Sequence, residues 1–551
     1  MAKPLRFFLV LLFICSFDLL ARQKSSQEKI QLLYDQATTS IAENEEGFLV
    51  VSISTSDLSR FNRQGFIQYS DFGAAGDGQS DDQLNIVASH AVANDTQLPV
   101  IADKEATYYI GGKDRKAIIQ TDTDFGKAKF IIDDRDVINR NAPIFEVQSA
   151  LAPIQVNGLS KLQKGQAKLG ISLPQECLIT VKDSTVRRYI RFGLNPNSGY
   201  PQTDIFKTDR QGNIDPASPI IWDFDQITEI IALPIDSKPL KITGGVFTTL
   251  ANQEESKYNY YSRNLLIRRS NVTIDGIQHF ISGEGDHGAP YSGFITIQDC
   301  ANVTVINGLF TGHKTYSTIG RADKPVNMGS YDLTVNRSLN VSFINCRQSN
   351  DINDRKFWGI LGSNYSKNLL YDNCTLSRFD AHMGVANATI RNSHLGHMGI
   401  NAIGTGTFLV ENTTISSNRL INLRSDYGST WEGEFIIKDC VFRPSNGQPS
   451  QAALIGGYNS GQHDFGYVCY MPEKITIENL TIEDAEHTSD YTGPELFGNF
   501  NPQRKDESYV EPFPYQITKK VTLKNIQIES GFKLDLSKDQ YMFRQVEIAE
   551  K

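Results

Sequence analysis

The chain has 551 residues, of which 40% are hydrophobic and 21% charged, with a formal net charge of −9 and a pI near 5.6. This length is too great for one small compact domain, but a single elongated solenoid could absorb it because a solenoid grows by stacking repeats. The acidic balance argues against nucleic acid as a partner, since nucleic-acid binding needs a basic surface. It also mildly disfavours a strongly anionic polymer, although a local basic groove would override the net charge.

The first residues are typical of an export signal. Lys3 and Arg6 precede an apolar run at residues 7–14, which is too short to span a membrane. We therefore expect a signal peptide at residues 1–21 and a secreted or periplasmic protein. Lipid attachment at Cys15 is an alternative that the sequence disfavours, because the residues before this cysteine do not form a lipobox. No later stretch is long and apolar enough to cross a bilayer.

After an N-terminal extension at residues 22–65, residues 69–82 read YSDFGAAGDGQSDD. Residues 82–92 then carry apolar side chains at helical spacing, which predicts a helix that closes the open end of a solenoid. The motif resembles the start of pectate-lyase-like superfamily proteins, and the resemblance covers about residues 66–145 and, through later repeats, about 240–530. It implies a right-handed parallel β-helix that acts on carbohydrate. It says almost nothing about chemistry, because the superfamily includes hydrolases, lyases and phage tailspikes.

Residues 150–237 interrupt the pattern that surrounds them. Turn signals at residues 193–199 and 209–213 separate short strand-like runs. This arrangement predicts a small β-rich insertion packed beside the first coils. Such an insertion would either bind carbohydrate or brace the end of the solenoid.

Between about residues 265 and 530 one phrase recurs: alternating apolar residues, then Asn or Asp, then a small residue. The turn residues of the copies are Asn307, Asn345, Asn373, Asn392, Asn412, Asp439, Asn479 and Asn525. Asn373 and Asn392 are 19 residues apart, and Asn392 and Asn412 are 20 apart, about the length of a three-strand coil. Longer intervals must contain loops, whereas a β-propeller would need about 40–45 residues in every blade. We predict an all-β chain whose main body is a single-stranded right-handed parallel β-helix, with an N-terminal helical cap and the small β-rich insertion.

These patterns divide the chain into an N-terminal cap with the first coils at residues 66–149, the insertion, the parallel β-helix at 238–535 and a C-terminal tail at 536–551. Cys346, Cys374 and Cys440 occupy the same place in their coils, which favours free buried thiols over disulfides. Asn-x-Ser/Thr sequences occur at Asn271, Asn302, Asn340 and Asn387. We expect these asparagines to mark the turn before a strand rather than to carry glycans.

An alignment of the coils on Asn373, Asn392 and Asn412 predicts a polar ladder, because residues two apart on a strand share a face. The alignment places Ala381, Ile400 and Ile421 level with one another and inward, followed by Met383, Ala402 and Leu423. Between them, His382, Asn401 and Asn422 are expected to be level and to face outward. Asp380 lies just before this ladder, and Arg424 and Asp426 lie just after it.

Neighbouring segments add more polar and aromatic side chains. Asp354, Arg355 and Trp358 lie on a long loop one coil earlier, and further polar segments occupy residues 283–288 and 431–434. Carboxylates, aromatic rings and histidine on consecutive coils are typical of a sugar site. We predict Asp380, His382, Asp426 and Asp354 as catalytic residues, and Trp358, Arg355, Arg424, Asn401, Asn422, His313, Lys314 and Tyr316 as substrate-binding residues. The alternative is that the aspartates only cap turns and the histidine is a surface group.

Two reactions fit these residues. A glycoside hydrolase needs two carboxylates, which Asp380 could supply with either Asp426 or Asp354. A polysaccharide lyase needs a base and a cation, such as His382 or Lys314 with Arg424 or Arg355. The acidic surplus of the chain favours the hydrolase, and the lyase is the alternative.

A non-catalytic glycan-binding β-helix is the third hypothesis. It would carry an evenly polar outer face, and the gathering of acids, bases and aromatic rings on a few coils disfavours it. The expected partner in every case is a polysaccharide or oligosaccharide. No HExxH motif, pair of CxxC motifs or EF-hand loop occurs, so we expect no cofactor, and only a structural calcium held by surface aspartates stays open.

Overall fold

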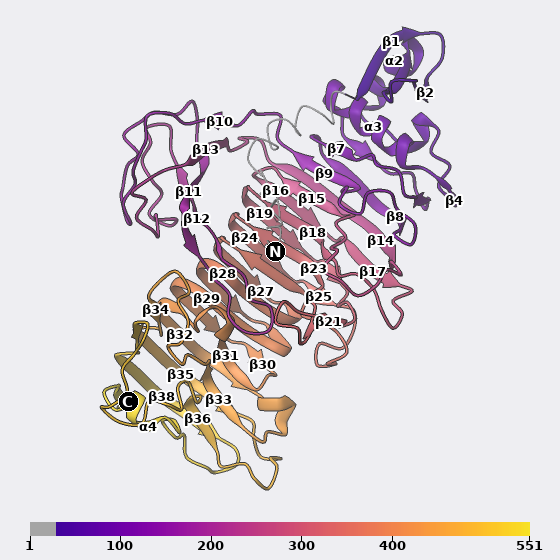
Figure 1. Cartoon of the computed structure of the whole chain (residues 1–551). Helices are drawn as coiled ribbons and strands as arrows, with labels where there is room; N and C mark the ends of the chain where they lie inside the picture. The colour runs from indigo at the N-terminus through magenta and orange to yellow at the C-terminus, as the bar shows by residue number, and fades with distance from the viewer. Residues whose placement is uncertain (1–28, 551) are drawn as a thin grey trace, which may run out of the picture.

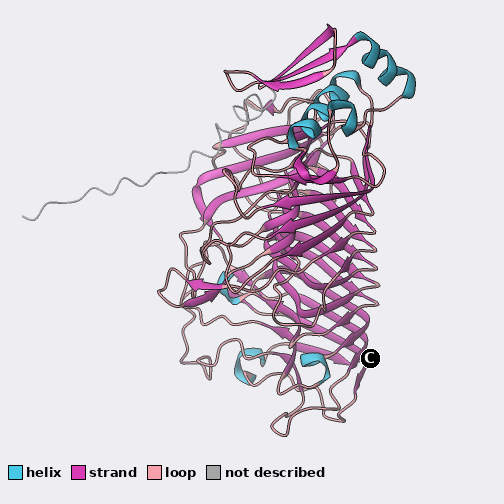
Figure 2. Ribbon diagram, turned by 90° about the vertical axis from the view of Figure 1, so that its right-hand side faces the viewer, coloured by secondary structure: helices cyan, strands magenta, loops and turns pink. Residues whose placement is uncertain are grey.

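The computed structural model describes residues 29–550, so the expected signal peptide and Cys15 lie outside the described residues. The strands form successive rungs of one elongated body, from the N-terminal elements at the upper right of Figure 1 to the C-terminal strands at the lower left. Figure 2 shows the rungs stacked in regular layers, as expected of a β-helix. Within residues 29–550, no helix is both long and apolar enough to span a membrane.

Parallel strand pairs join successive coils, and equivalent residues stay level from one coil to the next. Val272, Val303, Val341 and Leu369 are level on four successive coils. One row of parallel pairs runs through β14 (Leu240–Leu250), β16 (Val272–Asp275), β19 (Ala301–Ile306), β24 (Leu339–Ile344), β27 (Lys367–Asp372), β28 (Thr375–Arg391), β29 (His394–Glu411), β32 (Trp431–Phe442), β35 (Lys474–Ile482) and β38 (Lys520–Ile528). The long strands β14, β28, β29 and β32 also pair in neighbouring rows. Further parallel rungs are β8 (Thr123–Asp133), β9 (Phe145–Gln148), β15 (Leu265–Arg268), β18 (Ser292–Gln298), β23 (Tyr331–Asn336), β26 (Leu361–Asn364), β31 (Arg419–Leu423) and β33 (Ala452–Gly456).

Asparagines recur at two places in the coils: in turns between strands, such as Asn307 and Asn345, and within strands, such as Asn302 in β19 and Asn340 in β24. Asn302, Asn340 and Asn387 have φ values of 60°, 56° and 58°, in the left-handed region that asparagine tolerates better than most residues. Each side-chain amide also donates to the asparagine one coil earlier: Asn340 to Asn302 at 2.9 Å, Asn368 to Asn340 at 2.9 Å and Asn387 to Asn368 at 3.2 Å. Asparagine therefore recurs at these positions because it both tolerates the left-handed backbone conformation and forms the amide ladder between coils.

The interior of the β-helix is a continuous apolar stack that includes cysteines. Cys300, Cys346, Cys374 and Cys440 are at most 2% exposed, and all six described cysteines are free. Burial raises the pKa of Cys300 to about 12 and that of Cys440 to about 11, so these two thiols stay protonated. The expectation of free buried thiols is confirmed for the described cysteines.

The N-terminal end carries most of the helical structure. β1 (Ile30–Gln36), β2 (Ser40–Glu43) and β3 (Leu49–Ser54) form a separate sheet, followed by α2 (Thr55–Gln64). α3 (Gln83–Thr96) lies at the same end of the stack, and its buried side chains belong to the core of the β-helix. Asp82 ties the glycine-rich turn to this helix, since its carboxylate accepts from the backbone N–H groups of Ala75 at 2.6 Å and Gly76 at 3.1 Å.

The chain leaves the β-helix after β9 and returns at β14, which pairs with β8 of the preceding coil. The intervening segment forms an antiparallel sheet of β10 (Ile154–Gln155), β13 (Glu229–Pro234), β11 (Cys177–Arg188) and β12 (Tyr200–Thr208), with its own apolar cluster. Leu178 and Ile205 of this sheet pack on Ala301 and Leu339, so the sheet lies beside the middle coils rather than the first ones (Figure 1).

Candidate functional site

The structure corrects the predicted ladder by two residues. Asp380, not His382, is level with Asn401 and Asn422. The cause is a bulge: Leu376 pairs with Leu395 and Arg378 pairs with Gly399, so β29 contains two additional residues at this point. The expected level rows of apolar residues shift with it, and Phe379 rather than Ala381 lies beside Ile400.

Asp380 and Asp426 belong to a row of alternating charges. Asp380 is 0% exposed, and its carboxylate lies 2.9 Å from Arg378 and 3.8 Å from Arg424. Burial raises the pKa of Asp380, although the two guanidinium groups oppose this. Burial would also raise the pKa of Asp426, but Arg424 at 2.7 Å and Arg191 at 2.9 Å outweigh it and hold this pKa well below its usual range. Asp426 is therefore unsuited to act as a general acid.

The other two predicted catalytic residues also make structural contacts. His382 lies edge-on to Tyr427, and its Nδ1 is 2.8 Å from Oδ1 of Asn364. Burial lowers the pKa of His382 well below its ordinary value, so the imidazole is neutral. Asp354 accepts from the backbone N–H of Lys356 at 2.9 Å, as the turn-capping alternative predicts. The four residues do not share one open pocket.

Four of the predicted substrate-binding residues do share a pocket. It has a volume of about 350 Å³ and lies over the loop before β26 and over strands β29 and β31; we call it the outer-face pocket. Its lining includes the predicted Trp358, Arg355, Asn401 and Asn422 and the unpredicted His397 and Arg419, with Thr315, Asn327, Phe357, Met398, Ile400, Ser417 and Asn418. This lining contains three basic side chains and no carboxylate.

Hydrogen bonds fix the floor of the outer-face pocket. Asn422 donates to Oδ1 of Asn401 at 2.8 Å, Asn401 donates to the carbonyl of Met398 at 3.0 Å, and Arg419 donates to Oδ1 of Asn422 at 3.3 Å. These bonds hold both amides in place and leave the arginine at the edge of the floor. The arrangement is preorganised for a polar ligand.

His397 reaches the pocket because of the bulge in β29. Its Nε2 lies 3.1 Å from the carbonyl of Phe357, an acceptor, so Nε2 carries the proton and Nδ1 keeps a lone pair. Burial lowers the pKa of His397, which keeps the ring neutral. Alignment of the coils missed this histidine, since it assumed equal strand lengths. His397 lies in the sequence between His382 and Asn401 of the predicted ladder, and this position is the signal that could have found it. Bulges often redirect side chains at functional sites.

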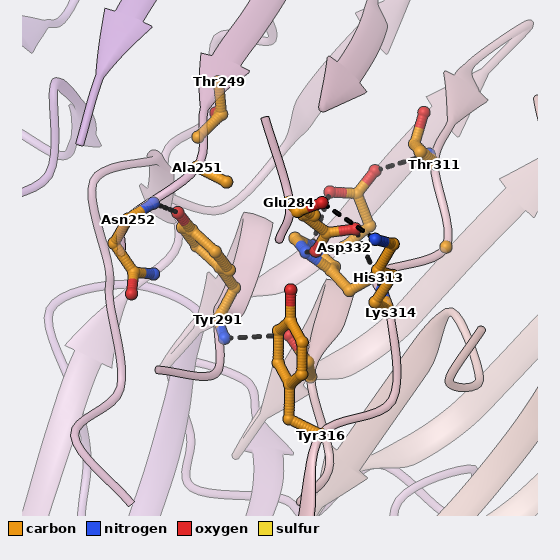
Figure 3. Close-up of polar contacts among 12 residues, drawn as sticks. Thr249, Ala251, Asn252, Glu284, Tyr291, Thr311, His313, Lys314, Tyr316 and Asp332 are labelled. Atoms are coloured by element: carbon orange, nitrogen blue, oxygen red, sulfur yellow. Dashed lines mark hydrogen bonds and ion pairs between the residues drawn. The ribbon is translucent and has the colours of Figure 1, made fainter. Parts of the chain in front are cut away.

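A second cluster lies on the neighbouring coils (Figure 3). Nδ1 of His313 is 3.3 Å from Glu284, and its Nε2 is 3.6 Å from Asp332, which also contacts His279 at 2.6 Å. Burial would lower the pKa of His313, but the two carboxylates outweigh it and raise this pKa to about 9. Burial would raise the pKa of Asp332, but the two imidazoles lower it to about 2. The cluster is a buried ionic network that includes a protonated imidazole.

Lys314 and Tyr316, both predicted to bind substrate, hold the Glu284 loop instead. Nζ of Lys314 donates to the carbonyls of Glu284 at 2.8 Å and Gly285 at 3.1 Å, and the Tyr316 hydroxyl donates to Gly285 at 3.1 Å. The same segment also contacts the outer-face pocket, because the carbonyl of His313 accepts from the backbone N–H of Trp358 at 2.7 Å. Among residues 29–550, no group of three or more His, Cys, Asp and Glu is placed to hold a metal ion.

Comparisons with known proteins show one fold. No protein-family model matches the chain. A capsule KL64-specific depolymerase of Klebsiella phage P510 is 31% identical over a 140-residue alignment that covers 20% of this chain and only 13% of that protein. The tailspike gp61 of Pseudomonas phage phi297 superposes with a TM-score of 0.51 and 11% identity over 84% of this chain and 80% of the tailspike. The tailspike gp49 of Pseudomonas phage LKA1 gives 0.47 and 13% over 84% and 81%. The chain has the right-handed parallel β-helix fold of phage tailspikes, the fold that its resemblance to the pectate-lyase-like superfamily implied.

Proposed function

We propose that the protein is a polysaccharide depolymerase that binds an anionic glycan in the outer-face pocket and cleaves it by β-elimination. The observation that carries this proposal is the lining of the pocket: it contains Arg355, Arg419, a neutral His397 and Trp358, and no carboxylate. The name of the phage relative, a capsule depolymerase, supports polysaccharide as the substrate.

The lining matches the needs of an elimination. A base removes the proton next to the carboxylate of a uronate, and the electron pair of that C–H bond forms a carbon–carbon double bond. The bond from the adjacent carbon to the glycosidic oxygen breaks, and the leaving oxygen takes up a proton from water. His397 is the candidate base through Nδ1, since its Nε2 is occupied by the Phe357 carbonyl. Arg355 and Arg419 would bind the uronate carboxylate and stabilise the negative charge that develops on it. Trp358 would support the sugar ring.

Glycoside hydrolysis is the second candidate. It requires two carboxylates about 5–10 Å apart that reach the substrate. Asp380 is fully buried, and Asp426 is paired with two arginines. Glu284 is the more accessible carboxylate for this reaction, since its side chain is 11% exposed, and it lies 3.3 Å from His313. The carboxylate on the other side of His313, Asp332, is 0% exposed and paired with His279, so elimination has the stronger support.

Incubation of the protein with uronate-containing polysaccharides separates these reactions. Elimination gives an unsaturated product that absorbs in the ultraviolet, while hydrolysis gives new reducing ends without that absorbance. Binding without either product would leave only a glycan-binding protein. The variant His397→Ala should lower kcat by about 10²–10⁴-fold if His397 is the base.

His394→Gln is the matched control for that variant. His394 lies three residues before His397 on the same strand, is also half-buried, and contacts Ser416 at 3.2 Å outside the pocket. It should keep wild-type kcat. Equal activity of His397→Ala and the wild type would exclude His397 as the base.

A further inference from the structure

A second cavity lies between the insertion and the β-helix. It has a volume of about 390 Å³, and we call it the insertion cavity. The insertion supplies one wall with Asp183, Arg188, Trp222 and Asp223, and the β-helix supplies the other through β28, β29 and β32. In Figure 1 the long β11–β12 hairpin follows this side of the parallel stack. None of the residues that sequence analysis assigned to substrate or catalysis lines this cavity.

The two walls are fixed relative to each other. Arg188 donates to the carbonyl of Gly466, and the backbone N–H of Ile190 donates to Phe465 at 3.1 Å. Lys367 of the β-helix and Asp204 of the insertion also form an ion pair of 2.8 Å, and both side chains are 1% exposed. The cavity is therefore preformed, as ligand pockets usually are.

Aromatic rings form the apolar part of the cavity. Trp222 from the insertion and Tyr467 from the loop after β33 lie 6.3 Å apart at 32°. The Arg188 guanidinium covers the indole at 4.6 Å and fixes its orientation. Half-buried, oriented aromatic rings beside polar groups are a surface on which the apolar face of a sugar ring can pack.

Carboxylates form the polar part. Lys164 bridges the walls: its backbone N–H donates to Asp223 at 2.8 Å and its Nζ to Glu432 at 2.7 Å. Among the described residues, the second oxygen of each of these carboxylates has no hydrogen-bond partner, so each can accept from a ligand hydroxyl. The lining holds four carboxylates, those of Asp183, Asp223, Asp225 and Glu432, against two basic groups, those of Lys164 and Arg188. This surplus of negative charge disfavours an anionic ligand.

We propose that the insertion cavity is a second saccharide-binding site that takes an uncharged sugar unit. Its charge is opposite to that of the outer-face pocket, so the two sites select different units. Gly404 of this cavity lies three residues after Asn401 of the outer-face pocket on β29, a separation of roughly 10 Å along the strand. One glycan that contains both kinds of unit can therefore contact both sites; this link rests on the proposed function, while binding at the cavity does not.

The three tryptophans of the chain make the test specific. Trp222 lines the insertion cavity, Trp358 lines the outer-face pocket, and Trp431 is 0% exposed in the core. In a Trp358→Phe variant the ligand-responsive emission comes from Trp222, and in a Trp222→Phe variant it comes from Trp358. The probes are cellotetraose, mannotetraose, chitotetraose and tetragalacturonate at millimolar concentration. Thermal unfolding midpoints equal to that of the wild type show that the variants fold.

We expect at least one uncharged tetrasaccharide to change the emission of Trp358→Phe saturably, and tetragalacturonate to leave it unchanged. Asp223→Asn in that background should weaken the response about tenfold, because a hydrogen bond to an ionised acceptor is stronger than one to a neutral amide. Asp223 is exposed, so this substitution does not disturb packing. A response that Asp223→Asn does not weaken, or no response to any uncharged probe, would overturn the proposal. Saturable binding at the cavity by a protein that cleaves no uronate polymer would instead contradict only the proposed function.

Discussion

Lys367 on β27 and Asp204 on β12 form an ion pair that joins the β-helix to the insertion. Nζ lies 2.8 Å from Oδ1, and both side chains are 1% exposed. Burial is the largest influence on both groups, lowering the pKa of Lys367 and raising that of Asp204. The pair therefore holds the insertion in position, although removing the two charged groups from water has a considerable free-energy cost.

Removal of one partner should be worse than removal of both. Lys367→Met leaves a buried carboxylate without its counterion, so we expect the free energy of unfolding to fall by about 3–5 kcal/mol. The double variant Lys367→Met/Asp204→Asn should recover most of that loss, because it removes both charges and keeps an acceptor for the backbone N–H of Ile205 or Ile221. Urea denaturation of the three proteins measures the difference. Equal losses in the single and double variants would mean that the pair does not hold the insertion.

Replacement of Asp380 distinguishes a structural role of this residue from a catalytic one. Neither of its carboxylate oxygens makes a hydrogen bond, so the guanidinium groups of Arg378 and Arg424 are its only compensation among the described residues. Asp380→Asn leaves Arg378 without a counterion, while Arg424 keeps Asp426, and the loss should destabilise the fold by about 3–5 kcal/mol. Asp354→Asn, at a partly exposed turn, should stay within about 0.5 kcal/mol of the wild type. If Asp380→Asn instead keeps full stability and loses all cleavage, Asp380 is a catalytic residue.

The fold was predictable because its determinants are local. The turn asparagines recur in the sequence, and Asn340 within β24 combines the left-handed backbone conformation with an amide bond to Asn302. Alternating apolar residues between such turns leave a parallel stack as the simplest solution. Cys374 could be assigned to the interior for the same reason.

The site was only partly predictable, because it depends on non-local geometry. Trp358, Arg355, Asn401 and Asn422 line one pocket, and their role in substrate binding stays a prediction. The two-residue bulge of β29, which sequence spacing does not locate, moved His382 out of the ladder and brought His397 into the pocket. Arg191 on the insertion reaches Asp426 across a sequence separation that no repeat pattern reports.

The buried network around His313 predicts a dependence of stability on pH. The pKa of His313 is raised from 6.5 to about 9 in the folded chain. Its contribution to stability is therefore complete below pH 6.5 and is lost as the pH rises through 9. A shift of this size corresponds to about 3 kcal/mol. Denaturation at a series of pH values between these limits should show the loss in the wild type and not in His313→Gln.

His287→Gln serves as the control for this experiment. His287 is exposed on the neighbouring loop, so its replacement should keep the wild-type slope. If His313→Gln shows the same slope as the wild type, another group titrates in this range. Asp332, whose pKa is lowered to about 2, contributes stability above pH 3.8 that is lost only as the pH falls through 2, so it does not interfere.

The arginines of the outer-face pocket predict how binding depends on charge. Arg419 borders the pocket floor, and its contact to Asn422 leaves most of its donors available to a carboxylate. Arg419→Ala should weaken binding of an anionic oligosaccharide such as tetragalacturonate by about 10–100-fold, the effect of losing a charge-assisted hydrogen bond. The salt dependence of binding should decrease with it. Arg391→Ala is the matched control, because Arg391 pairs with Asp372 at 2.8 Å outside the pocket and its replacement should change neither quantity. Titration calorimetry at two ionic strengths measures both, and equal affinity of Arg419→Ala and the wild type would exclude Arg419 from glycan binding.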